Sequence, residues 1–144
     1  MGDEGIVELE QELSALWQRA RVGTREAARS LHPRLDPSSY PVLAVLRRRG
    51  PLRMSELGSM LLHDKSTLSR QIDALVRLGL AERTVDPVDA RARLVSLTVE
   101  GRERMEALHA ERRVSWRAGL AGWEEGEVEE LSRLLRKFGE TGLT

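Results

Sequence analysis

Apolar residues recur at steps of three and four along most of this chain, which is the spacing of amphipathic helices. The spacing predicts helices over residues 6–31, 38–49, 54–61, 65–78, 100–120 and 123–138. Pro33 ends the first of them, because proline disfavours helical geometry in the preceding residue. Gly79 follows the fourth as the left-handed residue that commonly ends a helix. The chain is therefore expected to be mainly α-helical.

Short polar residues mark two of the predicted helix starts. Asp36, Ser38 or Ser39 could cap the helix at 38–49, and Pro41 favours Ser39 because proline is tolerated only in the first turn. Asp64 is a good N-cap for the helix that begins at Lys65. The pair 54–61 and 65–78, joined by a tight turn, is predicted to form a helix-turn-helix.

Two short segments, 81–85 and 94–98, contain alternating or β-branched residues and are predicted to form an antiparallel hairpin. Their connection is the charged turn Asp86-Pro87-Val88-Asp89-Ala90-Arg91. A charged hairpin directly after a helix-turn-helix indicates a wing. The predicted fold is a winged helix-turn-helix, mainly α with a small β wing, and helices at both ends.

The helix at 65–78 has the character of a DNA recognition helix. Its buried stripe is predicted to be Leu68, Ile72, Leu75 and Val76. The polar residues near its start are expected to project from the core and to bind DNA: Lys65, Ser66, Thr67, Ser69, Arg70 and Gln71. Small hydroxyls and an arginine suit entry into the major groove. Taken alone, a capped surface helix explains the same residues.

Arg91 and Arg93 are predicted to lie at or just past the tip of the hairpin. An arginine there can enter the minor groove, where the electrostatic potential is most negative. Asp86 or Asp89 would orient it through a charge-assisted hydrogen bond. A surface hairpin with a local ion pair is the competing explanation, and the preceding helix-turn-helix favours the wing.

Charge changes this picture only through its distribution. Lysine plus arginine and aspartate plus glutamate each number 23, so the net charge is zero. Residues 19–53, however, hold nine arginines and only two acids, which can present one basic face. Arg53, at the end of this segment, joins the candidate DNA-binding residues. Solvated helix faces of mixed sign are the alternative interpretation.

Other chemistries have little support in the sequence. The chain has no cysteine, which excludes disulfides, thiolate metal sites and cysteine nucleophiles. His32, His63 and His109 lack metal-ligand spacing and form no catalytic motif with a carboxylate, serine or lysine, so neither an enzyme nor a cofactor is expected. Metal sensing by these histidines stays open, and His63 is otherwise a turn residue near phosphate. Without a signal peptide or a run of about 18 apolar residues, a cytoplasmic protein is expected.

Three stretches of this chain resemble the MarR (multiple antibiotic resistance regulator) family of bacterial transcription factors. The start of the recognition helix, Asp64-Lys65-Ser66-Thr67-Leu68-Ser69-Arg70, is similar to that of the family. So is the exit into the wing, Leu75-Val76-Arg77-Leu78-Gly79-Leu80-Ala81-Glu82-Arg83. The wing signature is the most specific: the Asp86–Arg91 turn, then Val95-Ser96-Leu97-Thr98 and Glu100-Gly101.

The resemblance implies a homodimer that binds a pseudo-palindromic operator in double-stranded DNA, as a repressor released by a small ligand. Residues 36–98 would form the DNA-binding lobe, and residues 1–35 and 99–144 a helical dimerisation lobe, within one domain spanning 1–144. Ser66, Thr67, Ser69 and Arg70 would face the groove, and Arg91 would be the wing arginine, supported by Asp89. Family members that sense peroxide use a cysteine in the first helix, and this chain lacks it.

Two questions remain open at this stage. Zero net charge and the acids Asp64, Asp73 and Glu82 near the recognition elements would also suit a protein-interaction module that has lost DNA binding. Three aromatic residues could line an effector pocket: Trp17, Tyr40 and Trp116. Since buried aromatics mainly supply apolar area, the pocket residues stay unassigned.

Overall fold

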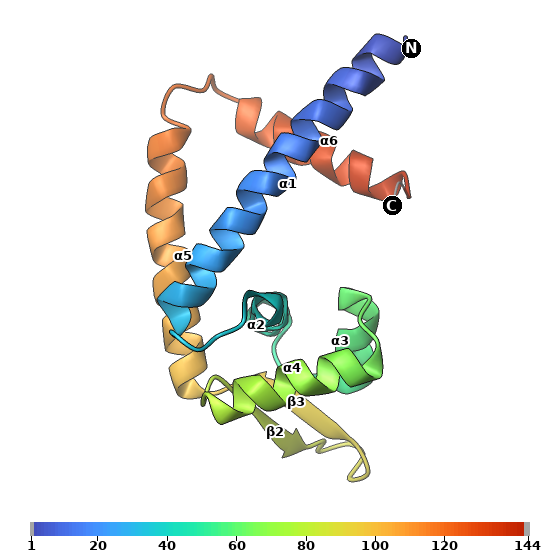
Figure 1. Cartoon of the computed structure of the whole chain (residues 1–144), viewed down its shortest axis with the longest axis vertical. Helices are drawn as coiled ribbons and strands as arrows, with labels where there is room; N and C mark the ends of the chain where they lie inside the picture. The colour runs from blue at the N-terminus through green and yellow to red at the C-terminus, as the bar shows by residue number, and fades with distance from the viewer. Residues whose placement is uncertain (1, 143–144) are drawn as a thin grey trace. The chain divides into compact units, whose positions relative to one another are not determined.

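The computed structural model describes residues 2–142 of the chain (Figure 1). Its elements are α1 (Asp3–Leu31), the 3-10 turn η1 (Pro37–Ser39), α2 (Tyr40–Arg49), β1 (Leu52–Arg53), α3 (Met54–Leu61), α4 (Lys65–Arg77), β2 (Ala81–Val85), β3 (Arg93–Leu97), α5 (Val99–Gly119) and α6 (Glu127–Glu140). The six predicted helices and both predicted strands are present. The last helix begins four residues later than predicted, after a left-handed Gly126. Two compact units divide the chain, one ending at His109 and the other beginning at Ala110.

The strands of the first unit form a small antiparallel sheet in the order β1-β3-β2. In its register, Ala81 faces Leu97 and Val85 faces Arg93, while Leu52 of β1 faces Val95. The sequence predicted only the β2–β3 hairpin. Strand β1 was missed because two residues are too short to show alternation.

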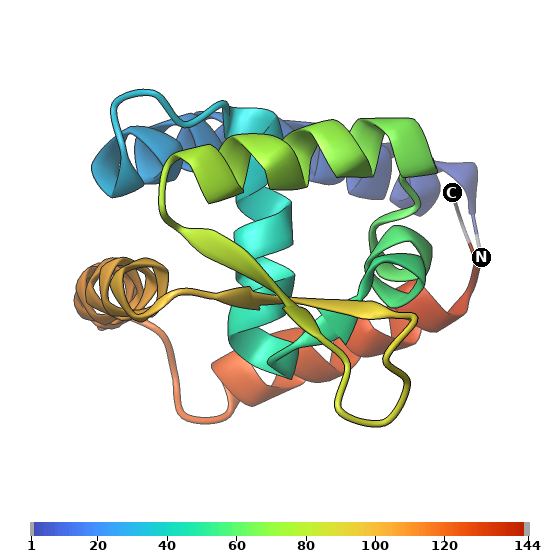
Figure 2. The same ribbon diagram turned by 90° about the horizontal axis from the view of Figure 1, so that it is seen from below.

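The core of the first unit lies around α2, which contacts α1, α3 and β3 (Figure 2). Apolar side chains from five elements meet there, and each is no more than 1% exposed: Val42, Leu43, Leu46, Leu57, Leu68, Ile72, Leu75, Val95 and Met105. This packing fixes α4 and the sheet on one body. Their relative positions therefore follow from the apolar pattern of the sequence.

Three predicted helix boundaries can be compared with the structure. Helix α1 ends at Leu31 and His32 is extended, as the following proline predicted. Asp64 caps α4 as predicted, because its Oδ1 accepts a hydrogen bond from the Thr67 amide at 2.7 Å. Ser39 occupies the N-cap position of α2, as predicted, but not through a side-chain hydrogen bond. The chain first makes the η1 turn, which Asp36 caps through the Ser38 amide at 2.8 Å, and the Ser39 side chain caps nothing.

Thr98 and Gly101 join the start of α5 to the loop that follows α4. The Thr98 hydroxyl donates to the Gly79 carbonyl at 2.6 Å and accepts from the Gly101 amide at 3.0 Å. A side chain at position 101 would collide with the Leu80 carbonyl, so the close approach requires glycine. These contacts give a structural reason for the threonine and glycine of the wing signature.

The second unit contains the distal part of α5 and the amphipathic α6. Its apolar residues Val128, Leu131, Leu134 and Leu135 recur at helical spacing and are 39–47% exposed. The part of α1 before residue 23 has a similar character, with Ile6, Leu9, Leu16, Trp17 and Val22 exposed. Among residues 2–142, no helix has both the length and the apolarity that a membrane span requires.

Candidate nucleic-acid interface

The start of α4 presents a polar surface beside the turn that joins it to α3. Lys65, Ser66 and Arg70 are exposed, and Thr67 and Ser69 are partly exposed. The opposite side of the helix is anchored in the core by Leu68, Ile72 and Leu75. The side chains expected to meet DNA are therefore displayed on a helix whose position is set by apolar packing.

Two residues of α4 do not lie as predicted. Gln71 was expected to project from the core, but it is only 9% exposed, whereas Val76, expected in the buried stripe, is 36% exposed. The two positions flank the stripe on either side, so periodicity alone does not distinguish them. Tertiary contacts decide the outcome, because η1 packs against α4 and contacts the Gln71 side.

Gln71 connects two other segments through its buried amide. Its Nε2 donates to the Ser38 carbonyl at 3.1 Å, and its Oε1 lies 3.0 Å from Nδ1 of His63, within hydrogen-bond distance. One side chain thus holds η1 on one side and the helix-turn-helix turn on the other. A buried amide with both ends bonded specifies the position of α4 along its neighbours.

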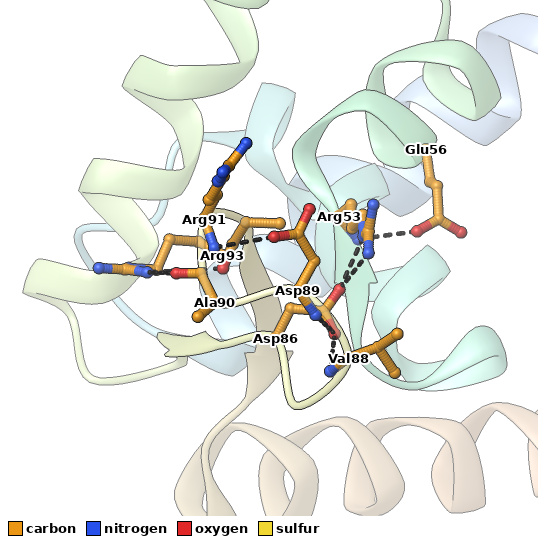
Figure 3. Close-up of polar contacts among 9 residues, drawn as sticks. Arg53, Glu56, Asp86, Val88, Asp89, Ala90, Arg91 and Arg93 are labelled. Carbon is orange, nitrogen blue, oxygen red and sulfur yellow. Dashed lines mark hydrogen bonds and ion pairs between the residues drawn. The ribbon is translucent and has the colours of Figure 1, made fainter.

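The tip of the wing is ordered by backbone hydrogen bonds (Figure 3). The Asp86 amide donates to the Ala92 carbonyl at 3.1 Å, and the Ala92 amide donates to the Asp89 carbonyl at 3.0 Å. Asp89 Oδ1 accepts from the Arg91 amide at 3.0 Å. Asp89 therefore fixes the backbone of Arg91 rather than its guanidinium.

The two wing arginines differ in their surroundings. Arg93 donates from Nη1 to the carbonyls of Ala90 and Ala92 at 3.4 and 3.5 Å. Arg91 is exposed, and no side chain or carbonyl among residues 2–142 bonds to its guanidinium. Figure 3 shows the two side chains leaving the hairpin in different directions. Arg91 is thus the wing arginine whose guanidinium makes no hydrogen bond within residues 2–142.

Asp86 is the first residue of the wing turn, directly after β2, and is 6% exposed. The Arg53 guanidinium donates to Asp86 Oδ2 from Nε at 2.7 Å and from Nη2 at 2.6 Å. Oδ1 accepts from the Val88 amide at 2.8 Å and the Asp89 amide at 3.4 Å. The Val88 amide, and after it the Arg53 guanidinium, hold the pKa of Asp86 below its ordinary value.

A groove of about 680 Å³ lies between α3, the start of α4 and the end of the wing. Charged, polar and apolar residues line it: Arg53, Met54, Ser55, Gly58, Ser59, His63, Lys65, Leu68, Ala92 and Arg93. Ser55 and Ser59 were not among the residues predicted from the sequence. Their spacing of four, on the side of α3 opposite Leu57, was the signal that could have found them.

Two of the three acids near the recognition elements, Asp64 and Asp73, have structural partners. Asp64 caps α4, and the Thr67 amide lowers its pKa. Asp73 forms an ion pair with Arg83 of β2. Since both carboxylates are used within the fold, their presence is a weaker argument for a surface that repels DNA.

The histidines are dispersed in the structure as in the sequence. His63 contacts Gln71, and His32 Nδ1 accepts from the Arg34 amide at 3.0 Å. The described part of the chain contains no group of three or more histidine, aspartate or glutamate side chains that could hold a metal ion.

A second groove, of about 450 Å³, lies between α1 and the η1–α2 segment. Trp17, Arg21, Arg25, Pro37, Ser38 and Pro41 are among its lining residues. Of the three aromatic candidates for an effector pocket, Trp17 alone lines this groove. Tyr40 is in the core at 7% exposure, and Trp116 is 70% exposed.

A helix-turn-helix followed at once by an antiparallel hairpin defines the winged helix-turn-helix class. Comparison with known proteins narrows the class. The family model described as MarR family matches residues 35–92. The uncharacterized HTH-type transcriptional regulator YxaD of Bacillus subtilis is 34% identical over 139 residues, which cover 96% of each chain. The chain belongs to the MarR family of transcriptional regulators, which are not enzymes.

Two further comparisons concern the fold and a relative of stated activity. A MarR family protein from Bacillus stearothermophilus has the same fold, with a TM-score of 0.82 at 23% identity, over 98% of this chain and 97% of that one. The HTH-type transcriptional repressor IacR of Pseudomonas putida is 26% identical over 101 residues, or 70% of this chain and 60% of that protein.

Proposed function

We propose that this regulator binds double-stranded DNA as a homodimer, with α4 in the major groove and the wing in the adjacent minor groove. The observation that carries the proposal is that both α4 and the wing have exposed cationic side chains. Lys65 and Arg70 are exposed on the helix, and Arg91 is exposed on the hairpin with its guanidinium free of partners among residues 2–142. A helix and an arginine so placed suit the two modes of groove recognition.

Each contact surface has a defined part in this proposal. Lys65, Ser66, Thr67, Ser69 and Arg70 read or approach the major groove, and Arg91 enters the minor groove. Lys65 and Arg93 line the 680 Å³ groove on the protein surface. In the proposed complex, the phosphate backbone between the major and minor grooves of DNA passes along this surface. Asp89 serves indirectly, because it holds the Arg91 backbone.

Dimerisation is proposed through the terminal helices. The apolar residues of α6 and of the first part of α1 are exposed in the single chain. Exposed apolar stripes of this length are typical of helices that pack against a partner. A twofold dimer would place two α4 helices in half-sites about one helical turn of DNA apart, which matches a pseudo-palindromic operator.

Repression relieved by a small molecule is the remaining part of the proposal. It is supported by the relative named as a repressor in Pseudomonas putida. The groove that contains Trp17, Arg21 and Arg25 is the proposed effector site, because an indole and two guanidinium groups suit an aromatic acid. Its lining residue Ser38 bonds to Gln71 of α4, so a ligand there would adjoin a contact of the recognition helix.

The first experiment measures binding of the purified protein to the DNA upstream of its own gene at several salt concentrations. Binding that weakens steeply with salt, at two chains per site, is the expected result, because phosphate contacts release counterions. If no binding occurs there, selection from random duplexes distinguishes a distant operator from a loss of DNA binding. Failure of both would favour a protein-interaction module.

A further inference from the structure

The Asp86 carboxylate accepts hydrogen bonds from two segments, from Arg53 of β1 and from the amides of the wing turn. Both donors of Arg53 converge on Oδ2, and the amides of Val88 and Asp89 converge on Oδ1. One oxygen therefore faces β1 and the other faces the wing turn (Figure 3). Because Asp86 is 6% exposed, the carboxylate is largely closed from solvent on this side.

Arg53 is also held through its own backbone. It pairs with Leu94 of β3, and its amide donates to Glu56 Oε1 at 3.1 Å, so the Glu56 carboxylate connects the first turn of α3 to Arg53. Arg53 thus joins three parts of the interface: the first helix of the helix-turn-helix, the central strand and the wing turn. The Asp86 carboxylate also accepts from the Asp89 amide, and the Asp89 carboxylate in turn accepts from the Arg91 amide.

We propose that Arg53 is a wing-positioning residue, which acts on DNA through Asp86 and Arg91 rather than by binding a phosphate. The proposal rests on the proposed DNA-binding function. It reassigns Arg53 from the set of direct DNA contacts expected from the sequence.

The alternative is a phosphate contact by Arg53, but the Arg53 guanidinium is already bonded to Asp86. Moving the guanidinium to a phosphate would leave the nearly buried Asp86 carboxylate without its cation, and an unpaired buried charge is costly. Lys65 and Arg93 line the same groove and have no carboxylate partner among residues 2–142. These two cations are the better phosphate ligands.

A double-mutant cycle between Arg53→Gln and Asp86→Asn tests the proposal. Each variant should lower operator affinity about fivefold to tenfold, and the double variant should lose no more than either, because both break one connection. The slope of log affinity against log salt should stay unchanged. A phosphate contact would instead make the slope shallower by about 0.9 for Arg53→Gln and make the two losses add.

A second cycle connects the effect to the wing arginine. In an Arg91→Ala background, Asp86→Asn should cause little further loss, since the cation that it positions is already absent. An undiminished loss in that background would overturn the proposal. If Arg53→Gln does not fold, Asp86→Asn carries the same test.

Limited trypsin digestion gives a readout that does not depend on DNA. Cleavage after Arg91 and Arg93, identified by mass spectrometry, should be several-fold faster in Arg53→Gln than in the wild type, because the hairpin opens more often. Arg47→Gln is the matched control, since it removes one charge and breaks the Arg47–Glu106 ion pair between α2 and α5.

The DNA-binding measurements and the trypsin digestion together distinguish failure of the proposed DNA binding from failure of the positioning role of Arg53. A wild-type protein that binds no DNA would refute the proposed function, and the cleavage rates alone would then decide whether Arg53 holds the wing. Unchanged cleavage at Arg91 and Arg93 in Arg53→Gln would refute the positioning role even if the operator is bound.

Discussion

Helix α4 and the wing face the same proposed ligand, but they are held in place by different interactions. In α4, Leu68, Ile72 and Leu75 are at most 1% exposed, so apolar packing fixes the helix. At the wing, Val85 at the end of β2 and Val88 in the turn are exposed, and the order of the turn depends on polar contacts to Asp86 and Asp89. The helix is thus positioned by the packing of apolar side chains, and the wing is positioned by ion pairing and hydrogen bonds.

This difference predicts which substitutions each element tolerates. Changes of side-chain volume should disturb α4 and the stability of the whole first unit. Removing the exposed charge of Arg91 at the wing should alter DNA binding and leave the free energy of unfolding almost unchanged. Variants in the two elements can therefore separate stability from binding.

The largest expected effect is in the helix. Ile72→Ala should lower the free energy of unfolding by about 2 to 4 kcal/mol, since it removes buried methyl groups and leaves a cavity. Val76→Ala, on the exposed side of the same helix, is the control and should change it by less than about 0.5 kcal/mol. Denaturant unfolding followed by circular dichroism measures both. Equal losses would mean that α4 is not anchored on the Ile72 side.

The wing should show the reverse. Arg91→Ala should weaken operator binding by about 1 to 3 kcal/mol, the usual cost of losing a groove arginine, with unfolding unchanged. Arg102→Ala removes an exposed arginine from α5 and serves as the charge control. Fluorescence anisotropy with labelled operator DNA gives the affinities. If both variants bind equally well, Arg91 does not contact the minor groove.

Gln71 is the buried polar residue that connects the helix to its neighbours. Gln71→Met keeps the packed volume but removes the bonds to Ser38 and His63, so the free energy of unfolding should fall by about 1 kcal/mol. The exchange rates of the amides around η1 and the α3–α4 turn should rise as well, which hydrogen exchange with mass spectrometry detects. Unchanged exchange at η1 would show that Gln71 does not connect the segments in solution.

Acid should affect both elements through their capping aspartates, and this effect is expected to be the smallest. The amides of Thr67 and Val88 are the largest causes that lower the pKa values of Asp64 and Asp86. A lowered pKa stabilises the fold above the unfolded value of about 3.9, and this stabilisation is lost as the pH falls through the folded value. Thermal midpoints of the wild type should fall more steeply below pH 4 than those of an Asp64→Asn, Asp86→Asn double variant.

Periodicity and capping residues were sufficient to predict the helices, the hairpin and the capping role of Asp64. They failed where a long-range contact decides the outcome. Gln71 and Val76 flank the buried stripe of α4, and only the packing of η1 distinguishes them. Likewise, the charged turn indicated that an aspartate orients the wing, but the partner of Asp86 is Arg53, which is 33 residues away in the chain.

The outline of the candidate site was easier to predict than its internal contacts. Exposed positions such as Lys65, Ser66 and Arg70 follow from helical spacing relative to the apolar stripe. The role of Asp89 does not, because its carboxylate could bond to a guanidinium or to an amide, and only the turn geometry selects the Arg91 amide. Strand β1, which carries Arg53, has too few residues for a pattern.

The order of the three strands has a further consequence for behaviour at high concentration. Both outer strands are open edges, where another chain could add a strand and begin aggregation. Strand β1 offers only two residues, and β2 carries the charged, exposed Glu82 and Arg83. Short length on one edge and charge on the other oppose such pairing, so the sheet that presents the wing also protects the protein from self-association through its strands.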